Sequence, residues 1–180
     1  ENAAKTIAVS GEISARKSAS DLEKKLKKLK NICYYAEKYA ASAVKIPTEV
    51  EWIIDNRYIA EREAKSVIAD LKKAKALPQA KEYKRPVIHA AAFSLVRSGK
   101  GEVNAERLRC FLENFQNALL LTEKELSLFV PMVKLALVSM LYETSRSIEN
   151  MILCLERNDK SNCFYAEELA EKLKSSGEDI

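Results

Sequence analysis

Glycine and proline are scarce in this sequence, with four of each among 180 residues. Most tight turns need one of these two residues, so their scarcity excludes a fold built from many short strands. Runs in which β-branched or aromatic residues alternate with polar ones between turn signals are also missing. The remainder is rich in Ala, Leu, Lys and Glu, which predicts long helices and an all-α fold.

Histidine, a common metal ligand, is scarce as well. The chain has one histidine, His89, and four cysteines, with no CxxC and no Cys/His pair at metal-ligand spacing. We therefore predict no metal site and no cofactor, and we interpret the cysteines as reduced residues of a cytosolic protein. The four are Cys33, Cys110, Cys154 and Cys163.

Neither charge sign is in large excess. The 30 basic and 26 acidic residues give a net charge of +4, which does not by itself indicate a nucleic-acid partner. The chain opens on a polar segment rather than on a signal peptide. Because it does not begin with Met, we expect it to be a fragment of a longer, cytoplasmic protein.

The periodicity predicts one domain, residues 18–174, between a tail at 1–17 and a tail at 175–180. Hydrophobic residues make up 47% of the chain, enough for a real core. We expect a helical bundle of about six helices, long and antiparallel, around a central apolar helix. The first is expected to begin at the N-cap Ser20–Asp21 and end at Pro47, and the others to span about 49–74, 86–97, 105–119, 122–156 and 163–174.

The first predicted helix has an apolar seam and a basic opposite face. The seam recurs at steps of four and three over three heptads, which is typical of a helix packed along one side. The basic face is a candidate contact for anionic lipid or phosphate, although such a face is more often simply solvated. The seam is Leu22, Leu26, Leu29, Cys33, Ala36, Ala40 and Ala43, and the basic face is Lys24, Lys25, Lys27, Lys28 and Lys30.

The second predicted helix places Arg57 within its core line, where the charge must reach solvent or find a carboxylate partner. On an adjacent face, Glu51, Asp55, Tyr58 and Arg62 follow at steps of four, three and four, so they can touch. Two carboxylates beside a Tyr and an Arg suggest acid/base chemistry. A network that fixes the helix is the stronger interpretation, because no nucleophile, His or metal ligand joins them, and we predict no catalytic residue.

Two later helix starts have clear capping signals. Asn104 is a predicted N-cap, and Thr122 with Glu125 is a predicted capping box. The stretch that follows, 126–142, is the most apolar of the chain and approaches the length of a membrane span. Lys134 and Pro131 weaken that alternative, so we predict a buried helix of a soluble domain, kinked near the proline.

A family resemblance rests on motifs in a fixed order over residues 45–142. Glu51-Trp52-Ile53-Ile54-Asp55-Asn56 resembles the Trp-Leu-Leu-Asp-Asn signature near the N-terminus of cyclic β-1,2-glucan synthases. Further matches follow in the family's order, with departures such as His89 in place of its Tyr. They are Leu77-Pro78, Tyr83, Pro86, Ile88, Gly101, Leu108, Phe111, Phe115-Gln116, Leu121-Thr122, Glu125-Leu126, Met132 and Leu135-Ala136-Leu137.

That resemblance implies a non-catalytic, cytoplasmic helical domain of a large membrane glycosyltransferase with a C-terminal phosphorylase-like module. It implies scaffolding or regulation, with the remainder of the synthase as partner and the inner face of the membrane as location. The signature residues Glu51, Trp52, Asp55, Asn56, Tyr58 and Arg62 would then be the first candidates for a contact surface. The alternative is a stand-alone helical module that binds proteins or an anionic membrane.

Sugar binding is a further hypothesis, because Trp52, Tyr58 and Tyr83 could stack on a sugar ring. The competing interpretation makes Trp52 a core or helix-contact residue, since Trp is highly buried on average. We favour the latter.

Overall fold

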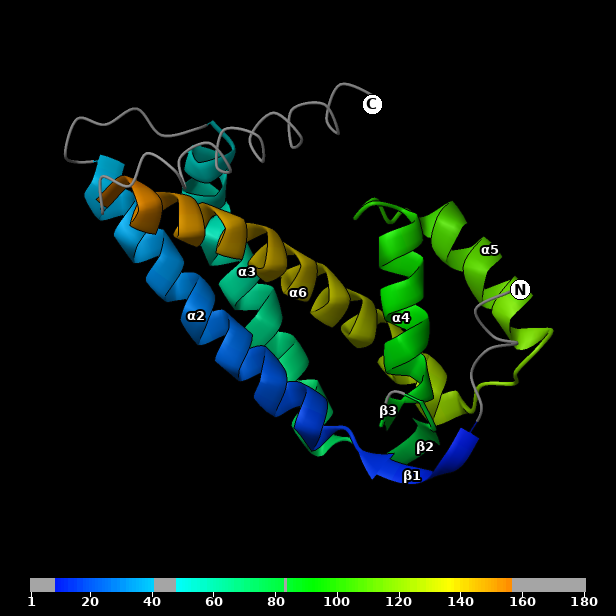
Figure 1. The fold of residues 1–180 in the computed structure, drawn as a ribbon. Coiled ribbons are helices and arrows are strands. Elements are labelled where there is room, and N and C mark those ends of the chain that lie inside the picture. The colour runs from blue at the N-terminus through cyan, green and yellow to red at the C-terminus, as the bar shows by residue number, and fades with distance from the viewer. Residues whose placement is uncertain (1–8, 41–47, 83, 157–180) are drawn as a thin grey trace. The chain divides into compact units, whose positions relative to one another are not determined.

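The computed structural model describes residues 9–40, 48–82 and 84–156, which are mostly helical with a small three-stranded sheet (Figure 1). Five helices lie in the described ranges, and the sixth predicted helix, 163–174, lies outside them. In chain order the elements are β1 (Val9–Ser14), α2 (Arg16–Ala40), α3 (Thr48–Lys73), β2 (Ala76–Ala80), β3 (Arg85–Pro86), α4 (Val87–Ser98), α5 (Ala105–Gln116) and α6 (Glu123–Glu156).

The chain divides into two compact units, which are described separately below. Unit 1 comprises Glu1–Leu26 and Ile59–Met140, and unit 2 comprises Lys27–Tyr58 and Leu141–Ile180. The boundaries fall inside α2, α3 and α6, so each of these helices contributes residues to both units.

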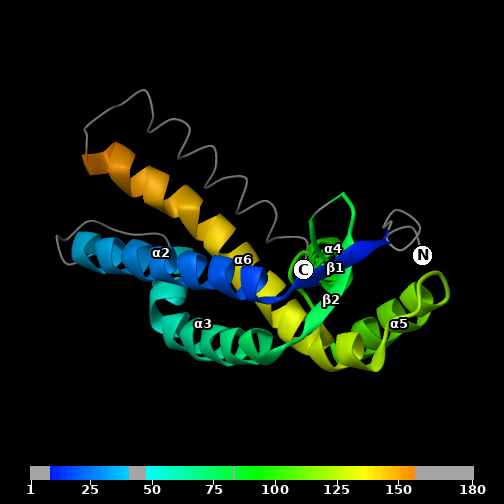
Figure 2. The ribbon, with the colours of Figure 1, turned by 90° about the horizontal axis from the view of Figure 1, so that it is seen from below.

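The sheet in unit 1 corrects the all-α prediction. Its strand order is β1-β2-β3, and both pairs are antiparallel. β1 and β2 lie side by side in both ribbon views (Figure 1, Figure 2). The register shifts between Val9 and Glu12, where Gly11 has a φ of 65°, as in a β-bulge. Residues 9–14 are thus a strand rather than part of a tail.

The start of α2 also differs from the prediction. The helix begins at Arg16, before the expected cap at Ser20 and Asp21, and the Ser14 hydroxyl accepts a hydrogen bond from the Arg16 N–H at 3.2 Å. Ala15 and Ala19 are fully buried in the core of unit 1. Burial of these small side chains explains why the helix extends toward the strand.

The core of unit 1 is formed by apolar faces that the periodicity predicted. Phe111 stacks on Phe115 and on Phe129, with ring centroids 5.7 and 6.2 Å apart. The α6 residues in this core include Phe129, Met132 and Ala136, as expected for a buried helix. On α4, the side formed by Ile88, Ala91, Ala92 and Leu95 is buried there too.

The two caps predicted for the later helices, at Asn104 and at Thr122 with Glu125, are present. The Asn104 side chain accepts a hydrogen bond from the Arg107 N–H at 2.8 Å. At the start of α6, the Glu125 carboxylate accepts hydrogen bonds from the Thr122 N–H and hydroxyl, each at 2.9 Å. The Glu125 N–H donates to the Thr122 hydroxyl in return, at 3.3 Å, so the capping box is complete.

One described segment, Glu123–Arg146, is long and apolar enough to cross a membrane by length and composition, and half of its most apolar window is buried. In unit 1 its charged member Lys134 pairs with Glu63 at 2.7 Å. The hydrogen bonds from Lys134 and then from Arg62 hold the pKa of Glu63 below its usual value. These contacts are those of a core helix with one charge at its edge.

Candidate functional site

Trp52, on the α3 part of unit 2, points into solvent. Its side chain is 60% exposed, and Tyr58 on the same helix is 63% exposed. The prediction that Trp52 lies in the core or at a helix contact is therefore wrong. Val50 and Ile53 occupy the buried positions of this segment, and one residue is about 100° of helix rotation, so Trp52 turns outward.

The other exposed aromatic rings also belong to unit 2. Tyr34 and Tyr35 on α2 are both more than half exposed, and their rings meet edge to face with centroids 5.7 Å apart. Among the side chains that the structure describes, these two and Trp52 and Tyr58 are the exposed aromatic ones. Tyr83, the third ring of the sugar-binding hypothesis, lies outside the described residues.

The polar side chains along α3 are exposed to solvent and do not form the predicted hydrogen-bond and ion-pair network. Glu51, Asp55 and Tyr58 are exposed, and no hydrogen bond joins them to one another among the described residues. Arg62 is also exposed and pairs instead with its neighbour Glu63 at 3.0 Å. Asn56 donates its side-chain N–H to the Trp52 carbonyl at 2.8 Å. The predicted network is therefore not formed.

Arg57 has the carboxylate partner that its place in the core line required. Its guanidinium lies 2.7 Å from the carboxylate of Glu37, which links α3 to α2 within unit 2. Both side chains are more than a third exposed, so the pair contributes less than about 1 kcal/mol to stability.

The five lysines of the predicted basic face have different surroundings. In unit 1, Lys24 lies 4.0 Å from Asp21, and the ammonium of Lys25 sits over the Phe93 ring at 5.9 Å from its centroid. In unit 2, Lys27, Lys28 and Lys30 are exposed.

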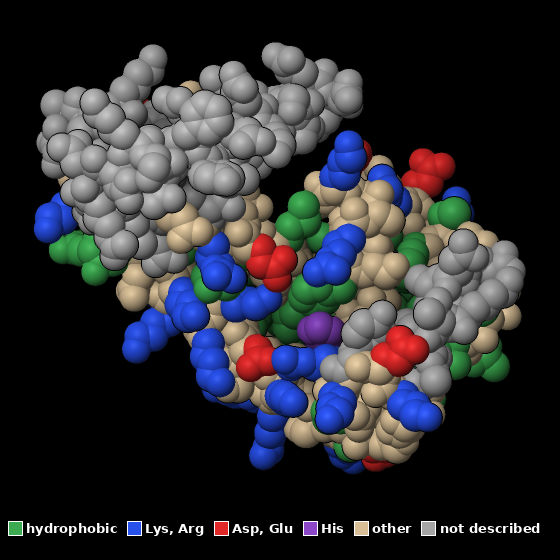
Figure 3. Space-filling model, viewed as in Figure 1, with side chains coloured by type: hydrophobic (Ala, Val, Ile, Leu, Met, Phe, Trp, Pro, Cys, Tyr) green, Lys and Arg blue, Asp and Glu red, His purple; other side chains and the backbone are tan. Residues whose placement is uncertain are grey.

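His89 stacks on Phe93, with ring centroids 4.4 Å apart and planes 21° from parallel. Burial, together with the positive charges of Arg85 and Lys25, lowers its pKa to about 4, against a smaller opposing effect of Asp21. The imidazole is therefore neutral at pH 7. Figure 3 shows the histidine, in purple, among basic and acidic side chains and with part of its ring at the surface.

Arg85 and Asp21 form an ion pair beside this histidine. Burial of Asp21 opposes its ionisation, but the hydrogen bond and charge of Arg85, helped by Lys24 and Lys17, outweigh burial and lower the Asp21 pKa. The Nη1 atom of Arg85 is buried without a hydrogen-bond partner in the described structure. The arrangement joins α2 to β3 and α4 in unit 1, which sequence spacing alone did not indicate.

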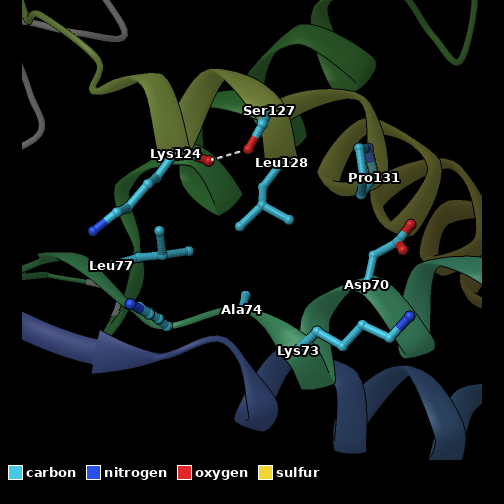
Figure 4. Close-up of a pocket in the computed structure, with 9 residues that line it drawn as sticks. Asp70, Lys73, Ala74, Leu77, Lys124, Ser127, Leu128 and Pro131 are labelled. Carbon is cyan, nitrogen blue, oxygen red and sulfur yellow. Dashed lines mark hydrogen bonds between the residues drawn. The ribbon is translucent and has the colours of Figure 1, made fainter.

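A cleft in unit 1 lies between the end of α3, the start of β2 and the first turns of α6 (Figure 4). Its volume is about 540 Å³. No sequence signal pointed to it, because its walls are separated by about fifty residues of chain. The lining residues are Asp70, Lys73, Ala74, Lys75, Leu77, Lys124, Ser127, Leu128 and Pro131.

Within the described ranges, no three His, Cys, Asp or Glu side chains are grouped so that they could hold a metal ion. Cys33 is buried and Cys110 is exposed, and both are reduced cysteines. Comparison of the chain with known protein families, curated proteins and solved structures finds no match.

Proposed function

We propose that this chain is a non-catalytic helical domain that binds other parts of a large membrane glycosyltransferase, one that resembles the cyclic β-1,2-glucan synthases. In this proposal the domain is cytoplasmic, lies at the inner face of the membrane through the parent protein, and scaffolds or regulates the synthase. We also propose that the long helices form an antiparallel bundle around α6.

The exposure of Trp52 carries this proposal. A buried Trp52 would indicate that the signature segment 51–56 packs inside the domain. Instead, the indole faces solvent beside the exposed Glu51 and Asp55. Exposed Trp and Tyr side chains supply much of the binding energy at protein interfaces, because a large apolar ring is desolvated there. Unit 2 presents four such rings, which supports a role in contacting another protein surface.

Substitution of Trp52 in the parent protein tests the proposal. Trp52→Ala should leave the stability of this domain within about 0.5 kcal/mol of wild type, since the side chain is exposed. It should weaken association with the synthase modules about tenfold, as loss of an interface Trp typically does. Co-purification of the domain with the remaining modules, together with the rate of glucan synthesis, measures the effect.

Leu120→Ala is the matched control, because Leu120 is an equally apolar but unrelated exposed side chain in unit 1, at 82% exposure. It should change neither association nor synthesis. Unchanged association and synthesis in the Trp52 variant would refute the contact surface. A parent gene without downstream transmembrane segments would refute the family assignment separately.

The alternative is a stand-alone module that binds an anionic membrane through α2. Lys27 and Lys28 favour it, because both are exposed and neither is ion-paired with a described residue. Lys24 and Lys25 weaken it, since each is already engaged by a neighbour in unit 1.

A further inference from the structure

The cleft of unit 1 has the size of a small-molecule site. Its volume of about 540 Å³ falls within the range of about 300 to 1,000 Å³ that is usual for ligand pockets. It is lined by three separate elements, α3, β2 and α6, that are packed on one hydrophobic core. The walls are thus held by the fold of unit 1.

The floor of the cleft is apolar. Leu77 from β2 is 1% exposed, and Leu128 from α6 extends toward it across the cleft (Figure 4). Ala74 and Pro131 complete this surface, and Ala74 is small enough to leave the space between the two leucines open. An apolar group placed here would lose contact with water on several sides.

The rim of the cleft is positively charged. Lys73, Lys75 and Lys124 line it, whereas Asp70 is the only acidic lining residue. All three lysines are exposed, and none is ion-paired with a described residue. The Ser127 hydroxyl, at the same rim, donates to the Lys124 carbonyl at 2.8 Å. An excess of ammonium groups around an apolar hollow attracts anions and concentrates them there.

We propose that this cleft binds a small amphiphilic anion, a carboxylate or sulfonate carried on an apolar aliphatic or aromatic body. The apolar body lies against Ala74, Leu128 and Pro131, above the buried Leu77, and the acid group lies at the rim that Lys73, Lys75 and Lys124 line. This site is distinct from the Trp52 surface, and it does not depend on the identity of the parent protein.

Titration of the whole chain with the fluorescent sulfonate 1-anilinonaphthalene-8-sulfonate tests this site. We expect saturable binding that decanoate displaces and that inorganic phosphate, which lacks an apolar body, does not. The double variant Lys73→Ala/Lys124→Ala should weaken binding about five- to tenfold, because each exposed charge pair contributes modestly. Raised ionic strength should reduce that difference by screening.

Three controls make the outcome decisive. Lys65→Ala/Lys81→Ala removes two exposed lysines of unit 1 that do not line the cleft, and it should bind as wild type does. Trp52→Ala removes an exposed ring that could bind the dye elsewhere, and it should also leave binding unchanged. Ser127→Trp fills the cleft from an exposed position without altering the core, so it should abolish decanoate-sensitive binding while thermal unfolding stays cooperative.

Absence of saturable binding would overturn the proposal. Equal weakening by the two double-lysine variants would do the same, since it would show general charge attraction rather than a site. If phosphate displaced the dye as effectively as decanoate, the apolar floor would not contribute to binding, and the proposal would be wrong. Binding only to anionic lipid vesicles would assign the lysines to a membrane surface instead.

Discussion

At the scale of single residues, the pKa of His89 differs strongly between the unfolded and the folded chain. Its ring is held against Phe93 and near two cations, Arg85 and Lys25, with Asp21 as the one opposing charge. The folded pKa of about 4 lies below the unfolded value of 6.5. Between these values the unfolded chain binds more protons, so stability falls as the pH falls.

Replacement of His89 should therefore flatten the acid dependence of stability. From pH 7 to pH 5, we expect the wild-type free energy of unfolding to fall by about 2 kcal/mol through this residue. In His89→Phe, which keeps a ring beside Phe93, that fall should disappear. Urea unfolding at the two pH values measures it.

Phe93→Leu is a useful comparison, because it removes the stacked ring and keeps the titrating group. It should be less stable at both pH values yet retain most of the pH dependence. An unchanged slope in His89→Phe would contradict the assigned cause. The window stays above pH 5 so that the lowered pKa values of Asp21 and Glu63 contribute little.

Residue patterns identified buried positions better than exposed ones. The seam from Leu22 to Ala36 is buried as predicted, because a helical period identifies the face that a core must cover. The prediction for Trp52 was wrong because it relied on the average burial of Trp. Trp52 is one residue from the buried Ile53 and therefore faces away from the core. The helical period was the better guide there.

At the scale of elements, the starts of α5 and α6 are the features that the sequence determined best. The capping box at Thr122 and Glu125 could be predicted because all of its partners lie within four residues. The three strands were missed because β1 and β2 are more than sixty residues apart and each holds a residue that is unusual in strands, Gly11 and Pro78. The cleft was missed for the same reason, since its walls meet only after folding.

Removal of the α6 cap gives a prediction at this scale. Thr122→Ala should lower the free energy of unfolding by about 1 kcal/mol, because it leaves the Glu125 N–H without its capping acceptor. Glu125→Ala should cost more, since this carboxylate is only 2% exposed and accepts two hydrogen bonds. Chemical unfolding of both single variants and the double variant measures these values.

The two substitutions should not be fully additive, because both remove the hydrogen bond between the Thr122 hydroxyl and the Glu125 carboxylate. Glu123→Ala, an exposed acidic neighbour in the same turn, provides the baseline and should change stability by less than about 0.5 kcal/mol. Additive losses would show that the reciprocal bonds are not what stabilises this helix start.

At the scale of the whole molecule, the net charge of +4 allows a test between the two functional proposals. The synthase-domain proposal predicts that the isolated chain stays in the supernatant when sedimented with anionic vesicles. The membrane-module alternative predicts binding that weakens as salt is raised and is lost in Lys27→Glu/Lys28→Glu. Lys65→Glu/Lys81→Glu carries the same charge change elsewhere and separates a local surface from overall charge.

The edges of the small sheet bear on how the molecule behaves at high concentration. The β1 edge is interrupted by the bulge at Gly11, and β3 is two residues long and ends at Pro86, which has no N–H to offer. In β2, Pro78 pairs with Glu12 of β1 and lies outside the two-residue pairing with β3. Because proline has no backbone N–H, Pro78 could not donate a hydrogen bond to a strand that extended β3. Neither edge presents a continuous row of donors and acceptors for a second molecule to extend. The protein should therefore resist aggregation by strand addition, even though its sheet has two edge strands, β1 and β3.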